Sequence, residues 1–332
     1  MTRAWVINGY DGYQGLSLEE FPEEVPGPGE VRLKIEAFAL NWGDADLMLD
    51  RYSFSFPQFP AKIGMEAAGI VEAVGEGVEG IEIGERYCTL PYFYYNQGTS
   101  AEKAVVDARY ITKAPEGLTA VESASVWMQF LTAYYPIVEF AKADPDKNIL
   151  VTAGTSTAGT AALQIGRMMG ANMISTTRYE YNRDYLKTAG AEHVFIADNG
   201  DLADFIREAT GGKGINMAFD PIGGGMINQY APAMSRDAEF VFYGGLDGTW
   251  PQVPLVAMWQ TNSIFRAYSL FNYVENPEML EKGLAFVYDA LASGELKPAI
   301  DKVYPFEGYK EAWDYLRAPR QSHGKVVVEV GK

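Results

Sequence analysis

The fold is decided by residues 149–177, which read ILVTAGTSTAGTAALQIGRMMGANMISTT. The apolar run 149–153 is typical of a parallel strand that is buried on both faces. A segment with the apolar spacing of a helix follows at 157–171, and a second strand-like run follows at 173–177. A turn of small residues joins the first strand to the helix. This order predicts one strand–helix–strand unit of a doubly wound parallel sheet.

The same alternation continues towards the C-terminus, and a different texture precedes it. Further helices are predicted at 181–190 and 201–211, and further strands at 193–197, 216–220, 238–245 and 263–270. Upstream, short apolar pieces punctuated by glycine, as in 64–90, indicate a β-rich domain. The run 324–330, GKVVVEV, looks like a strand and is expected to return to that domain. We therefore predict an α/β protein with a β-rich domain at 1–123, completed by 297–332, and a doubly wound domain at 124–296.

The counts of charged and metal-binding residues exclude several classes of protein. Of 332 residues, 27 are basic and 44 are acidic, and the formal net charge of −17 disfavours nucleic acid and anionic membranes as partners. The single Cys88 cannot form an internal disulfide, and with two histidines it cannot build a four-ligand zinc site. Carboxylate-rich sites for hard cations stay open, because 44 residues are Asp or Glu. The first residues carry no apolar targeting segment, and no run approaches eighteen apolar residues. We expect a globular protein of the cytoplasm.

The turn after the first strand has the features of a dinucleotide-binding loop. A pyrophosphate needs backbone N–H groups at a helix N-terminus and small residues that let the phosphates approach. Gly154 and Gly159 occupy the outer positions of the usual GxGxxG pattern, while Ser156 stands where the middle glycine belongs. The alternative is a turn of small residues that only packs the helix on the strand. We predict that a nicotinamide dinucleotide is bound by Gly154, Thr155, Ser156, Thr157, Ala158 and Gly159.

The end of the second strand indicates which nicotinamide cofactor binds. An acidic residue there would accept a hydrogen bond from the ribose 2′-hydroxyl of NAD, but the sequence has Thr177 and Arg178 instead. Arg183 and Lys187 follow, one helical turn apart. Such a basic cluster on an acidic protein suits a 2′-phosphate, so we predict NADP(H), with Thr177, Arg178 and Arg183 among its ligands. In the alternative interpretation, Arg183 and Lys187 lie on a solvated helix face and pair with neighbouring carboxylates.

Several motifs in one order resemble a known family over nearly the whole chain. They are NWGD at 41–44, GMEAAG at 64–69, LTAY at 131–134, the turn at 153–159 and HGKVVV at 323–328. Together they resemble the medium-chain dehydrogenase/reductases, and among these the zinc-free, zeta-crystallin-like quinone oxidoreductases. The resemblance implies a GroES-like N-terminal domain, a Rossmann domain and a cofactor cleft between them. It also implies a homodimer, in which the run 263–270 would be a pairing edge strand; an internal strand is the alternative.

The same resemblance identifies what this sequence lacks. Zinc-containing members of the family place a cysteine, a histidine and a third ligand near the nicotinamide. At those positions this sequence has Asn41, Met65 and, at or near the third, Met128. An amide and two thioethers do not make a zinc site. Glu66, beside Met65, could bind a metal ion, but the sequence offers no further ligands next to it. We therefore predict no metal, and a reaction that depends on hydrogen-bond donors.

The resemblance points to three candidate catalytic residues. Reduction of a carbonyl, quinone or enone places negative charge on oxygen, which donors must stabilise without zinc. Tyr52 lies near the position where the similar enoyl-thioester reductases are expected to carry a functional tyrosine, and its phenol can donate a hydrogen bond or a proton. The alternative is a packing residue in an aromatic stretch. Asn41 and Asp44 are expected to position the nicotinamide ribose and the adjacent loop.

Further cofactor contacts are expected elsewhere in the chain. Thr132 is expected on the nicotinamide side of the cofactor, with a hydroxyl in a helix interior as the alternative. Tyr243, Gly244 and Gly245 follow the fifth strand of the doubly wound sheet, where backbone groups of relatives approach the nicotinamide; the alternative is a plain turn. Lys325 matches the family, and is otherwise interpreted as a solvated lysine before a strand.

These features predict an NADPH-dependent, zinc-independent reductase of quinones, α,β-unsaturated ketones or related activated carbonyl compounds. Aromatic residues at 92–95, together with Trp127, Trp259 and Phe271, favour an apolar substrate without identifying it. The alternative is an NADP(H)-binding protein with a structural or regulatory role and little turnover, because such a protein would keep the same glycine-rich turn.

Overall fold

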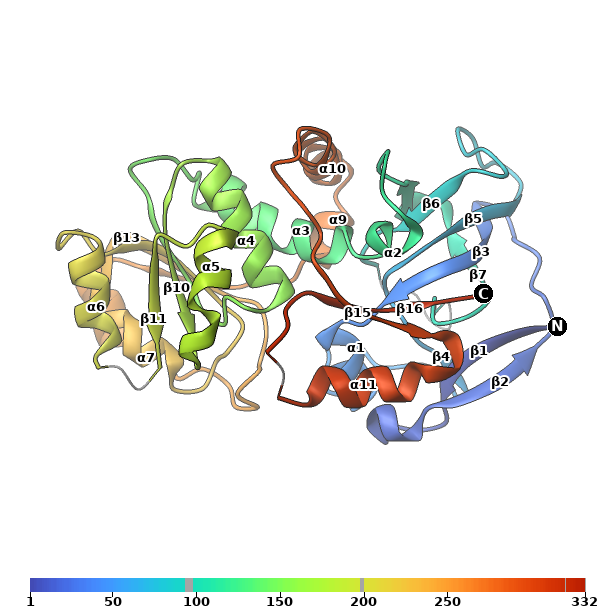
Figure 1. Cartoon of the computed structure of the whole chain (residues 1–332), viewed down its shortest axis with the longest axis horizontal. Coiled ribbons are helices and arrows are strands. Elements are labelled where there is room, and N and C mark those ends of the chain that lie inside the picture. The colour runs from blue at the N-terminus through green and yellow to red at the C-terminus, as the bar shows by residue number, and fades with distance from the viewer. Residues whose placement is uncertain (93–97, 198–199, 320, 332) are drawn as a thin grey trace. The chain divides into compact units, whose positions relative to one another are not determined.

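The computed structural model describes residues 1–92, 98–197, 200–319 and 321–331. The chain divides into two units, one formed by Met1–Met128 with Pro298–Lys332 and the other by Gln129–Lys297. Figure 1 shows the helices and strands of both units. The limits predicted for two functional domains stay predictions, because compactness alone does not assign a function to either unit.

A parallel sheet forms the centre of the second unit (Figure 1). In the described part of the chain its order is β11-β10-β9-β12-β13-β14, and each neighbouring pair runs parallel. The strands are β9 (Asn148–Val151), β10 (Asn172–Thr177), β11 (His193–Ile196), β12 (Ile215–Asp220), β13 (Met234–Phe242) and β14 (Ile264–Ala267). All residues of β9 are buried, as the apolar run predicted.

Helices lie on both faces of this sheet. The helices described from Trp127 to Ala292 are α3 (Trp127–Tyr134), which begins in the first unit and continues as a π-helical turn at Tyr135–Phe140, α4 (Thr157–Met168), α5 (Arg183–Ala189), α6 (Leu202–Ala209), α7 (Met226–Tyr230), α8 (Leu255–Thr261), α9 (Phe271–Val274) and α10 (Pro277–Ala292). Of these, α4 and α6 pack on opposite faces of the sheet. Ile174 of β10 packs in one core with Ile206 of α6. Its neighbour Met173 points to the opposite face, where Gly166 of α4 approaches it closely. The predicted doubly wound sheet is confirmed.

Several boundaries differ from the prediction by a few residues. The helix predicted over 157–171 ends at Met168, because Gly170 takes a φ of 81° that a helix cannot continue. The strand predicted over 238–245 runs instead from Met234 to Phe242. Tyr243 and the two glycines after it therefore lie in the loop that follows β13.

The first unit is rich in β-strands, as predicted. Its described strands form a larger sheet, β15-β16-β3-β5-β6-β8 with β7 also on β3, and a smaller sheet, β2-β1-β4. They are β1 (Thr2–Ile7), β2 (Ser17–Phe21), β3 (Glu30–Ala39), β4 (Ala61–Lys62), β5 (Ala67–Val74), β6 (Arg86–Thr89), β7 (Lys103–Asp107), β8 (Ile111–Lys113), β15 (Ile300–Pro305) and β16 (Lys325–Glu329). The helices of the unit are α1 (Trp42–Leu47), α2 (Ala120–Ser123) and α11 (Tyr309–Arg317).

An aromatic core fixes the C-terminal segment in the first unit. β16 runs antiparallel to β3, with Val327 opposite Ala39. The Tyr309 ring at the start of α11 lies 5.7 Å from the ring of Trp5 and 5.0 Å from that of Phe38, both in edge-on contacts. The end of the chain is thus part of the sheet that the first forty residues begin. No helix in the described ranges is long and apolar enough to cross a membrane.

Candidate functional site

The glycine-rich turn of the second unit links β9 to α4. The Gly154 N–H donates to the Thr176 carbonyl of β10 at 3.1 Å, and the Ser156 N–H donates to the Ala153 carbonyl at 2.9 Å. Ser156, at the position of the missing middle glycine, is the N-cap of α4, because its Oγ accepts from the Gly159 N–H at 3.1 Å. The other N–H groups of the first helical turn have no acceptor inside the helix. They suit an anion such as a pyrophosphate.

Close approach requires both outer glycines of the turn. A Cβ at Gly154 would lie 1.9 Å from Ser175 Oγ, and a Cβ at Gly159 would lie 2.8 Å from the Ala153 carbonyl oxygen. Real side chains do not make such contacts, so a larger residue would push α4 away from the sheet. The two glycines therefore allow α4 to pack closely on the sheet. This packing role is the one that the alternative interpretation, a turn without a cofactor, also gives them.

A buried hydroxyl beside the turn fits a ligand better than it fits packing alone. The Tyr243 ring stacks on Phe219 with centroids 4.0 Å apart. Its Oη is buried and has no hydrogen-bond partner among the residues that the structure describes. Burial is the main cause that raises the pKa of Tyr243. Since an unsatisfied buried polar group is unfavourable, the turn and Tyr243 together fit a polar group of a bound dinucleotide.

Sequence reasoning missed Asp220, which organises the loops around the turn. The carboxylate is buried at the end of β12 and accepts from Thr152 Oγ1 at 2.7 Å, from the Ile222 N–H at 2.8 Å and from Tyr230 Oη at 2.8 Å. Burial raises the pKa of Asp220, and these hydrogen bonds oppose the rise. The sequence feature that could have indicated this role is the acidic residue at the end of the apolar run 216–220, NMAFD. Asp220 ties the ends of β9 and β12 together.

The end of β10 separates Arg178 from the other predicted phosphate ligands. Arg183 is paired with Glu180, with Nη2 and Oε2 2.9 Å apart, and it also donates to the Val194 carbonyl. Lys187 donates to the Glu192 carbonyl. Arg178 has no such ion pair among the described residues; its exposed guanidinium lies 5.4 Å from the centroid of the Tyr179 ring. Arg183 thus pairs with a neighbouring carboxylate, as the alternative interpretation predicted, and Lys187 binds a backbone carbonyl instead of a carboxylate.

Thr177 is held in place by the short turn that follows Arg178. Asn182 Nδ2 donates to Thr177 Oγ1 at 2.7 Å. Tyr179 and Tyr181 stack with their ring centroids 5.1 Å apart, and both rings are exposed. The end of β10 therefore presents a fixed hydroxyl, a guanidinium that has no carboxylate partner among the described residues, and two aromatic faces.

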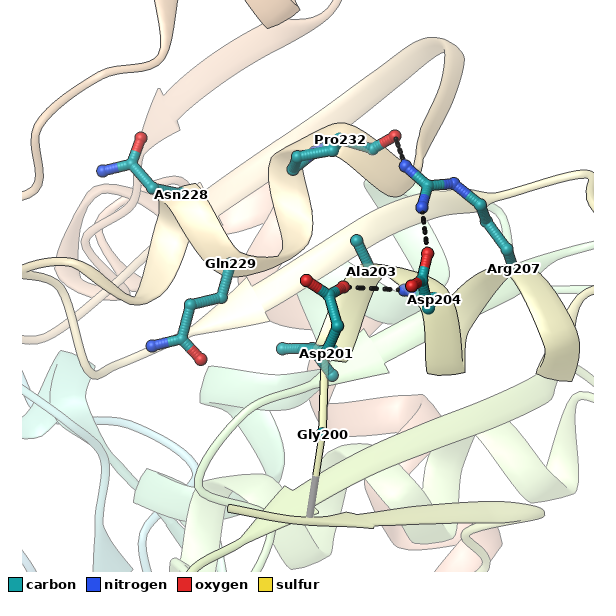
Figure 2. Close-up of a pocket in the computed structure, with 9 residues that line it drawn as sticks. Gly200, Asp201, Ala203, Asp204, Arg207, Asn228, Gln229 and Pro232 are labelled. Atoms are coloured by element: carbon teal, nitrogen blue, oxygen red, sulfur yellow. Dashed lines mark hydrogen bonds and ion pairs between the residues drawn. The ribbon is translucent and has the colours of Figure 1, made fainter. Parts of the chain in front are cut away.

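A surface pocket of about 480 Å³ lies elsewhere in the second unit (Figure 2). Asp201 caps α6 by accepting from the Asp204 N–H at 2.9 Å. Arg207 donates to Asp204 Oδ1 at 2.6 Å and to the Pro232 carbonyl at 3.0 Å, as the dashed lines show. The charged side chains of this pocket thus form hydrogen bonds and an ion pair within the protein. None of the predicted site residues lines the pocket.

The first unit holds a buried polar cluster at the predicted catalytic positions. Lys325 Nζ lies 2.8 Å from Glu66 Oε2 and donates to Asn41 Oδ1. Asn41 Nδ2 donates to the same Glu66 oxygen at 3.2 Å, and Glu66 Oε1 accepts from the Met128 N–H at 2.9 Å. Lys325 is 1% exposed, so the interpretation of it as a solvated lysine is wrong. The cluster joins the starts of α1, α3 and β16 to the segment before β5.

Asp44 and Tyr52 lie next to this cluster. Asp44 is in the first turn of α1, where its Oδ2 accepts from the Asn41 N–H at 3.0 Å. Burial is the main cause that raises the pKa of Asp44 to about 7, and the nearby Glu66 carboxylate adds to the rise. The Tyr52 ring packs over Gly43, since a Cβ there would lie 3.3 Å from the ring. Burial, and then the charges of Asp44 and Asp46, raise the pKa of Tyr52.

The remaining predicted residues have varied surroundings. Thr132 lies within α3 and is partly buried, and Gly244 and Gly245 follow Tyr243 in the loop after β13. Trp127 is fully buried, whereas Trp259 on α8 is 76% exposed. Residues 93–95 of the aromatic run lie outside the described residues.

Two of the positions at which zinc ligands were predicted to be missing have well-defined surroundings. Met65 is buried, and the Asn41 amide is engaged by Lys325 and Glu66. Within the described ranges, no group of three or more His, Cys, Asp or Glu residues could hold a metal ion.

Comparisons with known proteins agree with this fold and these motifs. An alcohol dehydrogenase GroES-like domain matches residues 27–116, and a zinc-binding dehydrogenase domain matches 189–328. The chain is 28% identical to a 2-haloacrylate reductase from a Burkholderia species, over 99% of both chains. It is 29% identical to the human synaptic vesicle membrane protein VAT-1 homolog, over 100% of this chain and 87% of the other.

Solved structures give the same result. A quinone oxidoreductase from Pseudomonas syringae superposes with a TM-score of 0.91 at 25% identity, over 99% of this chain and 100% of the other. The Escherichia coli quinone oxidoreductase complexed with NADPH has a TM-score of 0.90 at 25% identity with the same coverage. The chain belongs to the medium-chain dehydrogenase/reductase family, in the branch of the quinone oxidoreductases. Its GroES-like and Rossmann-like domains are confirmed, and its class of activity is oxidoreduction.

Proposed function

We propose that the protein is an NADPH-dependent reductase that transfers hydride, without a metal, to quinones, α,β-unsaturated ketones or related activated carbonyl compounds. The observation that carries the choice of cofactor is Arg178, an exposed guanidinium without a carboxylate partner among the described residues, at the end of β10. Two similar structures, those of the Escherichia coli enzyme and of mycobacterial Rv1454c, are complexes with NADPH. Asn41, Met65 and Met128 support a reaction without zinc.

Each part of the chain has a separate task in this proposal. The first turn of α4 and Tyr243 hold the pyrophosphate, and Thr177 and Arg178 hold the 2′-phosphate ribose. When bound, NADPH supplies the hydride. Tyr52 donates a hydrogen bond or a proton to the substrate oxygen, because its raised pKa keeps the phenol protonated at neutral pH.

The experiment that tests the function is a panel of electron acceptors. Oxidation of NADPH is followed by absorbance with quinones, enones, enoyl thioesters and aldehydes. We expect turnover with at least one class of acceptor, with NADPH preferred over NADH. Binding of NADPH without turnover on any of them would favour the alternative, a cofactor-binding protein with a structural or regulatory role.

Arg178→Ala is expected to weaken NADPH binding about 10- to 100-fold and to leave NADH binding nearly unchanged. A charge-assisted hydrogen bond to the 2′-phosphate contributes about 1.5–3 kcal/mol, and NADH has no such phosphate. Dissociation constants from the quenching of protein fluorescence measure the effect. Arg236→Ala, at an exposed arginine of β13, is the matched control. Equal losses for both cofactors would contradict the assignment of Arg178 to the phosphate.

We also propose a homodimer that forms through the edge of the parallel sheet. β14 pairs only with β13 among the described strands, and Ile264 on it is 55% exposed. Trp250, Leu255, Val256 and Trp259 are also exposed, in the loop before α8 and on α8 itself. Exposed apolar side chains beside a free strand edge favour pairing with a second copy. We propose the cytoplasm as its location, because the thiol of Cys88 is unpaired.

Ile264→Lys tests the dimer. A charge on the edge strand disfavours pairing with another strand. We expect sedimentation velocity to give a dimer for the unmodified protein and a monomer for the variant. A monomer in both cases would exclude the proposed assembly.

A further inference from the structure

The ion pair between Lys325 and Glu66 is more deeply buried than stability explains. Both side chains are 1% exposed, with Nζ and Oε2 2.8 Å apart. Taking two charges out of water offsets most of their attraction, and apolar residues of similar volume are often as stable. A pair in this position therefore calls for a role other than stability.

The pair holds one side chain, that of Asn41, at both ends. Lys325 Nζ donates to Oδ1, and Glu66 Oε2 accepts from Nδ2 at 3.2 Å. Since the ammonium only donates and the carboxylate only accepts, a single orientation of the carboxamide satisfies both. The three residues come from β16, the segment before β5 and the link between β3 and α1. The orientation of the carboxamide therefore depends on how three segments that are distant in sequence are placed.

Asn41 in turn is the N-cap of α1, whose first turn carries the predicted catalytic residue Asp44. Its N–H donates to Asp44 Oδ2 at 3.0 Å, and its carbonyl accepts from the Asp44 N–H at 3.0 Å. Gly43, in the same turn, is the surface on which the Tyr52 ring packs. A rotation of the Asn41 carboxamide would therefore displace the first turn of α1, and with it Asp44 and Tyr52.

We propose that Lys325 and Glu66 are positioning residues, which lock the Asn41 carboxamide and so set the first turn of α1 for hydride transfer. This role rests on the proposed reductase function. Lys325 acts through Asn41 rather than by contact with the cofactor, although it was predicted as a cofactor ligand. Glu66 also holds the start of α3 through the Met128 N–H, so the pair is tied to a fourth segment.

The test removes both charges at once. Lys325→Met alone would leave the Glu66 carboxylate buried without its cation and could unfold the protein, whereas Lys325→Met combined with Glu66→Gln removes both charges of the pair. The glutamine oxygen can still accept from the Met128 N–H. Arg86→Met with Glu36→Gln is the matched control, because that pair also joins segments of the larger sheet, with Nε and Oε2 2.6 Å apart, but is half-buried and contacts no site residue.

Hydrogen exchange measures the positioning without any substrate. We expect the amides of α1 to exchange at least about tenfold faster in the neutral-pair variant, while those of α11 are unchanged. The control pair should leave both helices unchanged. Unchanged exchange in α1 would overturn the proposal even if the protein has no turnover on any acceptor, so its failure and the failure of the reductase function are distinguishable.

Kinetics separate positioning from general stabilisation. We expect kcat to fall about 10²-fold in the neutral-pair variant, because small displacements of reacting groups have effects of this size, with the KM for NADPH within about threefold. If the pair acts through Asn41, Asn41→Ala lowers kcat by a smaller factor in the neutral-pair variant than in the unmodified protein. Multiplicative losses of kcat, or a wild-type kcat in a folded neutral-pair variant, would contradict the proposal.

Discussion

Asp44→Asn is expected to stabilise the protein at alkaline pH, with an advantage that grows by about 2–3 kcal/mol between pH 5 and pH 8. Burial raises the pKa of Asp44 from its usual 3.8 to about 7 in the folded protein. Between these values the folded state keeps a proton that the unfolded state has lost. The stability of the unmodified protein therefore falls as pH rises from about 4 to about 7, and is then constant with respect to this group.

The asparagine variant lacks this dependence because its side chain carries no charge. Its oxygen can still accept from the Asn41 N–H, so the start of α1 keeps that hydrogen bond. Urea unfolding at pH 5, 6, 7 and 8 measures the difference between the two proteins. Asp146→Asn, at an exposed turn, is the control and should give a difference that does not change with pH. A constant difference for Asp44→Asn as well would mean that Asp44 is ionised throughout this range.

Tyr52→Phe is expected to lower kcat about 10²-fold or more on the best acceptor, with NADPH binding unchanged. The change removes one hydroxyl and keeps the ring that packs over Gly43. The pKa of Tyr52 is raised by burial and by the negative charges of Asp44 and Asp46. The group is therefore a protonated donor at neutral pH, as stabilisation of a developing oxyanion requires.

The comparison that decides the role of Tyr52 is steady-state kinetics at saturating NADPH. Tyr304→Phe in β15 is the matched control, since its ring also packs on another aromatic ring, tilted against Tyr315 with centroids 6.0 Å apart, and lies outside the polar cluster. We expect the control to keep the kcat of the unmodified protein. If Tyr52→Phe also keeps it, Tyr52 is a packing residue, as its edge-on contact with Phe54 would then explain.

Local patterns in the sequence were sufficient for most of the fold. The apolar run at β9, the spacing of α4 and the small residues between them predicted the strand–helix unit, and both were found within a few residues. Apolar periodicity survives in any environment that buries one face of an element, so it can be interpreted without knowledge of the partner. The motifs that resemble the quinone oxidoreductases are local in the same sense.

Side-chain partners were not accessible in this way. Arg183 and Arg178 are both basic residues near the end of β10, yet only the structure places Glu180 and the Val194 carbonyl on Arg183. Asp220 ends an apolar run, but its role depends on Thr152 and Tyr230, which lie on other elements. Whether a charged group is free or engaged depends on contacts that the order of residues does not specify.

The order of residues was enough to predict the doubly wound sheet and the glycine-rich turn of 153–159, and, through the family resemblance, a site with Asn41, Met65 and Met128 in place of zinc ligands. It did not predict that Lys325 is buried on Asn41, a residue 284 positions away, and shares Glu66 with it. The physical reason is that propensity and periodicity act over a few residues, whereas burial and ion pairing depend on which distant segments meet.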